Sequence, residues 1–274
     1  MKKGLSSFNI VSLVFGFAFL YLPILLLILF SFNASKLVTV WGGFSTKWYG
    51  EMIRNEALMQ AAWMTLKVAV SSSTCATVLG TIAGLIMVRF GSFRGRTLFS
   101  GMIYAPLVMP DVIIGLSLLL MFVAISIDRG FMTITIAHIT FSMCYVAVVV
   151  QSRLVTFDQS IEEAAMDLGA PPFRTFFQVT LPIIMPAVVS GWLLSFTLSL
   201  DDLVIASFTS GPGATTLPMK IYSSVRLGVT PEINAVSTIL VGLVAVGVVT
   251  ASHITRRQEL QRQKDEQMAA DEAL

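Results

Sequence analysis

The sequence predicts an all-α integral membrane protein with six transmembrane helices. Hydrophobic residues make up 55% of the chain and charged residues only 12%, whereas soluble domains contain about 25% charged residues. The mean hydropathy is +0.80. The charged residues cluster between apolar runs, and a run of about 20 residues can cross a bilayer as a helix. Six runs are long enough, at about residues 8–32, 60–88, 98–127, 131–151, 183–208 and 233–254.

The composition also argues against other classes of protein. A formal net charge of +2 and a pI of about 8.6 are too slight to indicate a nucleic-acid partner, and no basic stripe with interleaved aromatic residues is present. Cys75 and Cys144 both fall inside apolar runs. We expect them to be free thiols, because their positions favour neither a disulfide framework nor a metal site.

The first span superficially resembles a secretory signal peptide, because Lys2 and Lys3 precede its apolar run. The run is longer than a signal peptide requires, and no convincing small-residue cleavage site follows it. We therefore expect an uncleaved first span. The loop at residues 33–58 carries Trp41, Trp48 and Tyr49, aromatic residues suited to the membrane interface, and a short amphipathic helix is expected there.

The third span contains two prolines, Pro106 and Pro110, and Asp111 follows the second directly. Proline removes a helical hydrogen bond and clashes with the preceding turn. We therefore expect this span to be kinked or broken. The fifth span is expected to run on through Asp201 and Asp202 without a break.

The remaining segments complete one membrane domain, residues 1–254. A cytoplasmic loop at residues 152–182 joins the fourth span to the fifth, and a polar loop precedes the sixth. Residues 255–274 form a charged tail, for which we expect a frayed cytosolic helix.

The distribution of Lys and Arg predicts the orientation, since cytoplasmic loops carry an excess of both. With both termini inside, eleven basic residues lie on the cytoplasmic side: Lys2, Lys3, Arg89, Arg94, Arg96, Arg153, Arg174, Arg256, Arg257, Arg262 and Lys264. Seven lie on the opposite side: Lys36, Lys47, Arg54, Lys67, Arg129, Lys220 and Arg226. We therefore expect both termini, and the loop at residues 152–182, in the cytoplasm.

That loop contains a polar stretch at residues 160–182 that is long enough to form a docking surface. Ser160 followed by Glu163 has the spacing of a capping box, which predicts a helix from Ile161. Gly169 can adopt the left-handed conformation that ends helices, and the prolines just beyond it cannot continue one. The predicted helix is therefore about two turns long.

The spacing in this stretch also resembles a known family motif. Residues 163–165 (EAA), three residues, Gly169, nine residues and residues 179–182 (VTLP) are similar to the EAA loop of ATP-binding-cassette importer permeases. Only Val179 departs from the pattern, in place of isoleucine. The resemblance implies a coupling helix that inserts into a cleft of a separate ATPase subunit. Its implied docking residues are Glu162, Glu163, Ala164, Ala165 and Gly169. The other interpretation is an ordinary cytosolic helix-loop-helix.

Three carboxylates fall inside the predicted spans: Asp111, Asp201 and Asp202. A carboxylate there costs roughly 2.5 to 3.5 kcal/mol on insertion scales and usually faces a bundle interior or a watery path. We expect all three, with Tyr104 as an aromatic wall for a cation, to line a substrate path. Asp202 continues a small polar stripe at helical spacing that includes Ser195 and Ser199, whereas Asp201 lies about 100° away.

Each of these residues has an alternative interpretation. Asp111 can be the first residue of a restarted half-helix, where its charge meets the positive end of the helix dipole. Asp202 can belong to a helix-packing stripe, Asp201 can be structural in the same way, and Tyr104 can be a packed aromatic.

Carboxylates in a path without buried Lys or Arg to neutralise them suit a cationic solute such as a diamine. Nearly the whole chain resembles the putrescine/spermidine branch of the importer permeases, through stretches such as APLVMPDVIIGLSLLL and GWLLSFTLSLDDLVIASF. The resemblance implies a type I ABC importer permease fold and transport of putrescine, with spermidine or another small cationic solute as the alternative.

It also implies a set of partners in the bacterial inner membrane. These are a homologous second permease, two ATPase subunits, a periplasmic polyamine-binding protein and the lipid bilayer. ATP and Mg²⁺ would bind the ATPase subunits, so we expect no cofactor, no metal and no enzymatic activity on this chain. The sequence agrees in lacking a G-x-x-x-x-G-K-[ST] phosphate-binding loop.

Two other functional classes are less well supported. An intramembrane hydrolase needs a nucleophile and a base, but His138 and His253 lie in no recognisable catalytic or metal-binding motif. His138 is more typical of a buried histidine whose hydrogen bonds are satisfied within a helix bundle. A stand-alone secondary transporter would explain the carboxylates but not the spacing of the EAA loop.

Overall fold

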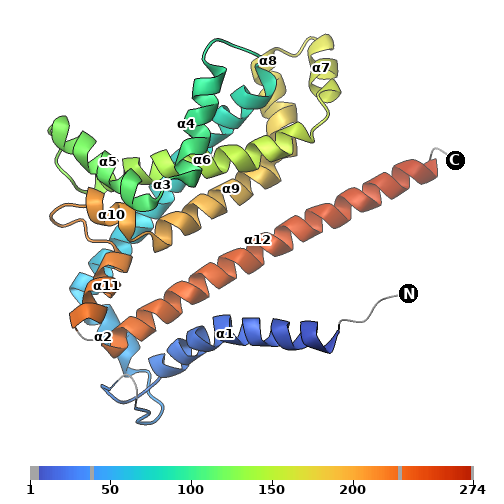
Figure 1. The fold of residues 1–274 in the computed structure, drawn as a ribbon. Helices are drawn as coiled ribbons and strands as arrows, with labels where there is room; N and C mark the ends of the chain where they lie inside the picture. Colours follow the sequence, from blue (N-terminus) through green and yellow to red (C-terminus); the bar gives the residue numbers. More distant parts are fainter. Residues whose placement is uncertain (1–5, 38–39, 228–229, 273–274) are drawn as a thin grey trace. The chain divides into compact units, whose positions relative to one another are not determined.

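The computed structural model describes residues 6–37, 40–227 and 230–272 (Figure 1). Lys2 and Lys3, which entered the orientation prediction, and the last two residues of the charged tail lie outside these ranges. In the described ranges all regular secondary structure is helical, with one isolated β-bridge between Asn33 and Phe44. Within these ranges, five helices are long and apolar enough to cross a membrane, or six if one bent pair counts as a single span. The predicted all-α membrane fold is confirmed.

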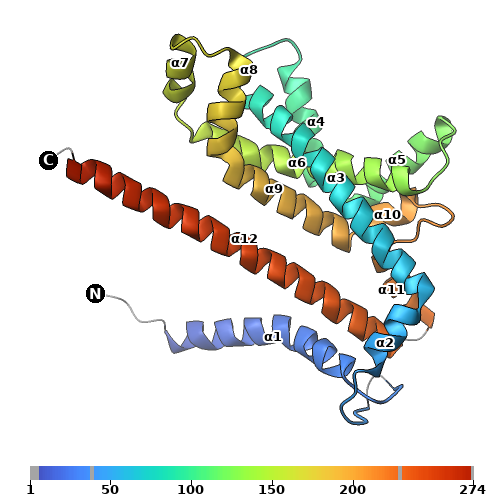
Figure 2. The same ribbon diagram turned by 180° about the vertical axis from the view of Figure 1, so that it is seen from behind.

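The chain divides into two compact units. The first comprises the described residues up to Met59 and from Ile221 onward. It contains α1 (Ser7–Ser31), α2 (Lys47–Arg54) and α12 (Pro231–Glu272), and α12 packs against both α1 and α2 (Figure 2). α2 is the short amphipathic helix expected in this loop, and it buries Trp48 and Met52. α12 continues from the apolar span through the charged tail without a break.

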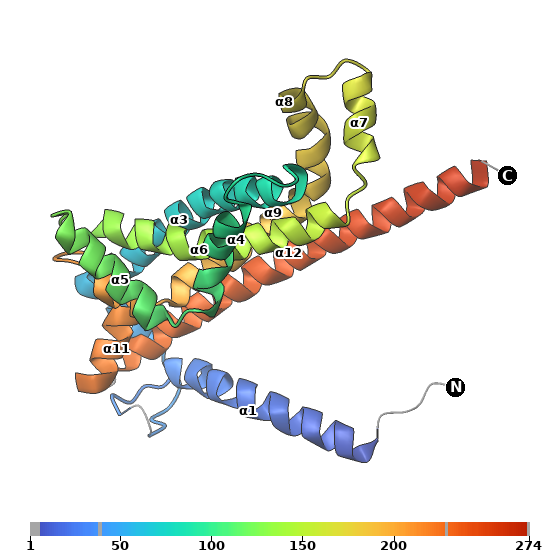
Figure 3. The ribbon, with the colours of Figure 1, turned by 45° about the horizontal axis from the view of Figure 1, so that its top comes forward.

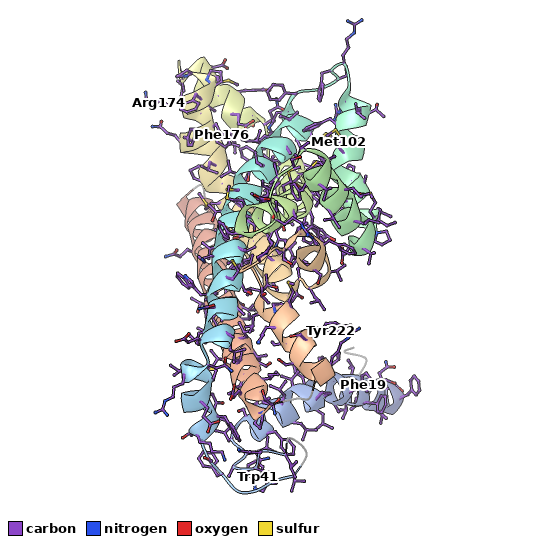
Figure 4. The ribbon with its side chains drawn as sticks, turned by 90° about the vertical axis from the view of Figure 1, so that its left-hand side faces the viewer. Phe19, Trp41, Met102, Arg174, Phe176 and Tyr222 are labelled. Atoms are coloured by element: carbon purple, nitrogen blue, oxygen red, sulfur yellow. The ribbon has the colours of Figure 1, made fainter. Side chains whose placement is uncertain are left out.

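The loop between α1 and α2 is held by Asn33, which is buried. Its carbonyl accepts a hydrogen bond of 2.6 Å from the Trp48 indole, and its side-chain oxygen accepts one of 2.7 Å from the Gly42 amide. The most apolar stretch of α1 has no buried residue, and side chains such as Phe19 project from this helix (Figure 4).

The second unit, residues 60–220, is built around α6 (Phe131–Val155). This helix packs against α4 (Arg96–Val108), α9 (Leu181–Asp201) and α10 (Val204–Thr209). α3 (Glu56–Arg89) approaches α6 closely at Gly80, where an added Cβ would lie 2.7 Å from the Met143 carbonyl oxygen. Only a residue without a side chain permits this approach.

The third predicted span is broken, as expected. α4 ends at Val108, and α5 (Asp111–Ala124) begins after Pro110 with a bend of 118° between the two helices. α5 then packs on α6 and α10 through a buried cluster made of Ile114, Leu118, Phe122, Ala137, Phe141 and Ile205. The prediction of six spans therefore holds only if this bent pair counts as one.

The fifth predicted span differs from expectation at both ends. It begins earlier, because α8 (Pro172–Thr175) and the π-helix η1 (Phe176–Thr180) lead directly into α9. It is also interrupted, because α9 ends at Asp201 and Asp202 has extended backbone angles before α10 starts. The expected continuous helix through both aspartates is therefore wrong. Its break is held by contacts of the Asp202 side chain, described below.

Candidate functional site

The helix predicted in the loop at residues 152–182 is present as α7 (Ser160–Asp167), which is two turns long. α7 and α8 lie side by side and form a hairpin that projects from the second unit (Figure 3). Arg174 and Phe176 belong to the same end of this unit (Figure 4). The hairpin exposes apolar side chains, namely Ile161, Met166, Leu168 and Phe173. Exposed apolar groups on a short projecting hairpin suit contact with another protein.

The capping box predicted at the start of α7 is not formed. The helix begins one residue earlier than expected, so the Glu163 amide already donates to the Gln159 carbonyl (3.1 Å), and no side chain caps the helix. The Ser160 amide donates instead to Asp158 (3.0 Å). Two hydrogen bonds from Ser160 hold the pKa of Asp158 below its usual value, and the bond from the backbone amide contributes more than the bond from the side chain.

The end of α7 is formed as predicted. Gly169 has a φ of +91°, the left-handed conformation that favours glycine. Its amide donates to the Met166 carbonyl (2.9 Å), and the next amide, of Ala170, donates to the Ala165 carbonyl (3.1 Å). These two bonds make a Schellman motif. The helix therefore stops at a defined residue and the chain turns toward α8.

The two adjacent glutamates of α7 face in different directions. Glu163 is exposed together with Ala164, and Ala165 is half-buried. Glu162 is buried, with its carboxylate 2.8 Å from Nε of Arg89 and accepting a 2.6 Å hydrogen bond from Thr180. Neighbouring residues of a helix lie about 100° apart, so one outward-facing surface could not include both. The sequence motif alone did not indicate which glutamate would face inward.

Two of the predicted path residues, Asp111 and Asp201, are exposed at helix ends. Asp111 is the first residue of α5, directly after Pro110, which agrees with its interpretation as the start of a half-helix. Asp201 is the last residue of α9. Both are exposed. Ile114, three residues after Asp111, and Ile205, four residues after Asp201, belong to one buried cluster. The packing of α5 on α10 therefore places these two helix ends in the same part of the second unit.

Asp202 points inward instead. Its carboxylate accepts hydrogen bonds from the Ile205 and Ala206 amides (3.2 and 2.7 Å) at the start of α10. It also lies 3.1 Å from Nε2 of His138, and Nδ1 of the same imidazole lies 2.6 Å from the Ser199 hydroxyl. His138 is therefore a buried histidine satisfied within the bundle, as expected.

Tyr104 lies on α4, on the other side of the break from Asp111. Its hydroxyl donates to the Gln151 side chain (2.9 Å), and its ring remains partly exposed. In the described part of the chain no three His, Cys, Asp or Glu side chains gather as a metal site. The roles of these residues in a substrate path, and of the α7 residues in docking, stay predictions.

Comparison with known proteins places the chain among transport components. Residues 76–259 match the family described as "Binding-protein-dependent transport system inner membrane component". The "Putrescine transport system permease protein PotI" of Escherichia coli (strain K12) is 59% identical over 270 residues, which cover 96% of each chain. The "Spermidine/putrescine transport system permease protein PotC" of the same strain is 45% identical over 240 residues, or 88% of this chain and 90% of PotC.

Solved structures share the fold at lower identity. A chain of a bacterial ABC transporter that imports the acidic polysaccharide alginate superposes with a TM-score of 0.69 at 16% identity, covering 91% of this chain and 99% of that one. A chain of the MetNI methionine ABC transporter superposes with a TM-score of 0.62 at 19% identity, covering 73% and 94%. The predicted type I importer permease fold is therefore confirmed.

Proposed function

This chain belongs to the family of binding-protein-dependent transport system inner membrane components, and on that premise we propose that it is the permease subunit of an ATP-driven polyamine importer with putrescine as its main substrate. The observation that carries the proposal is the 59% identity, over 96% of both chains, to a permease named for putrescine. The permease named for spermidine and putrescine is 45% identical. The chain is a multi-span component of the bacterial inner membrane.

Its proposed partners are a second permease, two ATPase subunits and a periplasmic polyamine-binding protein. ATP and Mg²⁺ would bind only to the ATPase subunits, so this chain would carry no cofactor. Both termini would be cytoplasmic, which places α7 on the side where ATP is available. The two-turn length of α7 and the exposed apolar side chains of its hairpin support docking there.

We place the cation contacts of this chain on Asp111 and Asp201. Both carboxylates are exposed, and α5, which begins at Asp111, packs on α10, which follows Asp201, through the buried cluster described above. Two negative charges along one path favour a solute with two ammonium groups. Asp202 would not contact the solute, because its carboxylate already bonds His138 and the start of α10. It would instead stabilise the break between α9 and α10 that leaves Asp201 exposed. Tyr104, partly exposed on α4, would contribute a ring face to the inner part of the path.

Uptake of labelled putrescine tests the function directly. Cells without their own polyamine uptake would express the partner subunits with and without this chain, and unlabelled spermidine would serve as competitor. We expect uptake that requires both this chain and cellular ATP, and little competition by spermidine. Equal uptake with and without the chain, when all subunits are present in the membrane, would reject the polyamine assignment. Strong competition would instead favour spermidine as a second substrate.

A further inference from the structure

Glu162 joins three elements of the second unit. Its Oε2 atom lies 2.8 Å from Nε of Arg89, the last residue of α3. Its Oε1 atom accepts a 2.6 Å hydrogen bond from the hydroxyl of Thr180, the last residue of η1 before α9. The side chains of Arg89 and Glu162 are only 15% and 11% exposed. A carboxylate on the docking helix is therefore shielded from water and shared by the ends of two long helices.

Arg89 depends on Glu162 for its charge balance. Among the described residues Glu162 is its one ion-pair partner. Both Nε and Nη2 of Arg89 are buried without a hydrogen bond, so the 2.8 Å contact between Nε and Glu162 is an attraction of opposite charges and not an aligned hydrogen bond. The Arg89 guanidinium also lies 5.4 Å from the centre of the Phe157 ring, which covers it. A buried ion pair resists separation because either charge left alone lacks water to stabilise it. The contact is thus suited to hold α7 against α3 while α7 moves.

α7 also packs on the segment that leads into α9, and its ion pair with α3 is formed by Glu162. Its backbone packs against α8 and η1, and Glu163, on the adjacent position, is exposed. In the part of the chain that the structure describes, the pair of Glu162 with Arg89 is the ion pair between α7 and α3.

We propose that Glu162 is a positioning residue for energy coupling, which transmits displacement of α7 to α3 through Arg89 and to α9 through Thr180. This inference rests on the proposed function, because α7 is displaced only if an ATPase subunit docks on it. Glu163 would then face the ATPase and take part in docking. Glu162 would face the permease and transmit the movement of α7 to the long helices. Loss of Glu162 would leave the ATPase bound and active while less of its motion reaches the path.

A double-mutant cycle in the reconstituted transporter tests this division. Complete complexes in proteoliposomes would be assayed for ATP hydrolysis stimulated by loaded binding protein and for putrescine imported per ATP. We expect Glu162→Gln and Arg89→Met each to lower the import per ATP about tenfold, with the ATPase still co-purifying. The double variant should lose much less than the product of the single losses, because it leaves no buried charge unpaired. A second cycle with Thr180→Val should show the same non-additivity.

Two control variants separate transmission from docking and from general damage. Glu163→Gln should weaken co-purification of the ATPase and combine additively with Arg89→Met. Arg94→Met, at an exposed arginine between α3 and α4, should change neither readout. Additive losses in both Glu162 cycles, or an unchanged import per ATP in Glu162→Gln, would overturn the inference. Absence of putrescine import in the wild-type complex would instead reject the proposed function, so the two failures are distinguishable.

Discussion

His138 holds Asp202 from a position 64 residues away in the chain, with Nε2 of the imidazole 3.1 Å from Oδ2 of the carboxylate. Both side chains are nearly inaccessible to solvent. The same carboxylate accepts the amide hydrogen bonds that start α10. The break between α9 and α10 therefore places Asp202 inside the bundle and leaves Asp201 exposed at the end of α9.

Removing the imidazole should destabilise the protein. In His138→Leu, the Asp202 carboxylate and the Ser199 hydroxyl lose a buried partner, and each such loss costs about 1–3 kcal/mol. We expect a lower midpoint of thermal unfolding for the detergent-solubilised complex. His253→Leu is the matched control, because His253 is exposed on α12. Equal midpoints for His138→Leu and wild type would contradict a stabilising role.

Asp201→Asn should weaken putrescine transport without reducing the amount of protein in the membrane. Loss of a charge-assisted contact of roughly 1.5 kcal/mol corresponds to about a tenfold rise in KM. Initial uptake rates over a range of putrescine concentrations measure this change. Asp128→Asn, at an exposed carboxylate in the turn after α5, should leave KM unchanged. A normal KM in Asp201→Asn would remove this residue from the proposed path.

Asp111→Asn should also reduce uptake more than assembly. Asp111 starts α5, where a negative charge is worth about 0.3–1 kcal/mol to the helix, so the folded complex should tolerate its loss. We expect slower uptake with normal co-purification of the partner subunits. Unchanged uptake kinetics would leave Asp111 with the helix-starting role alone.

Gly169→Asp should uncouple transport without preventing membrane insertion. The φ of +91° at this position strains most residues with a side chain, and the Schellman motif that ends α7 depends on it. Gly169→Asn is the matched control, because Asn and Asp both tolerate left-handed conformations better than most residues and Asn adds no charge. We expect ATP-dependent putrescine uptake to fall much further in the Asp variant. Equal uptake by wild type and the Asp variant would argue against docking at this turn.

Gly80→Ala should destabilise the second unit. An added Cβ would meet the Met143 carbonyl at 2.7 Å, and overpacking of this kind costs about 1–3 kcal/mol. Gly101→Ala in α4 is the control, since nothing lies within 4 Å of an added Cβ there. Thermal unfolding of the two variants should separate them, with Gly101→Ala close to wild type. If both unfold at the same temperature, the helices at Gly80 adjust without cost.

The break at Pro110 and the end of α7 at Gly169 could be predicted because each depends on the backbone chemistry of one residue. The break at Asp202 could not, because its neighbours include neither proline nor glycine and its partner His138 belongs to another helix. The capping box failed for a related reason. The Ser160 amide donates its hydrogen bond to the Asp158 side chain instead of to Glu163. Because the helix starts one residue earlier, the Glu163 amide donates to the Gln159 carbonyl and cannot bond the Ser160 hydroxyl.

The assignment of Glu162 and Glu163 to opposite faces likewise depended on tertiary structure. Glu163 is the first residue of the EAA motif and Glu162 directly precedes it. Glu162 faces inward because Arg89, at the end of α3, and Thr180 bind its carboxylate. The function was predictable for a different reason, since it came from a resemblance that extends over nearly the whole chain. Local chemistry alone indicated a cation path and a docking helix.

The π-helix η1 constrains the length of the segment between α8 and α9. A π turn closes its hydrogen bond over one more residue than an α turn, and one residue corresponds to about 100° of rotation around a helix. The number of residues between α8 and α9 therefore sets the direction in which the hairpin is presented. A deletion of one residue in this segment would therefore turn the hairpin by about 100° around the axis of α9 while retaining every side chain on it, which gives a physical reason for the fixed spacing between Gly169 and residue 179.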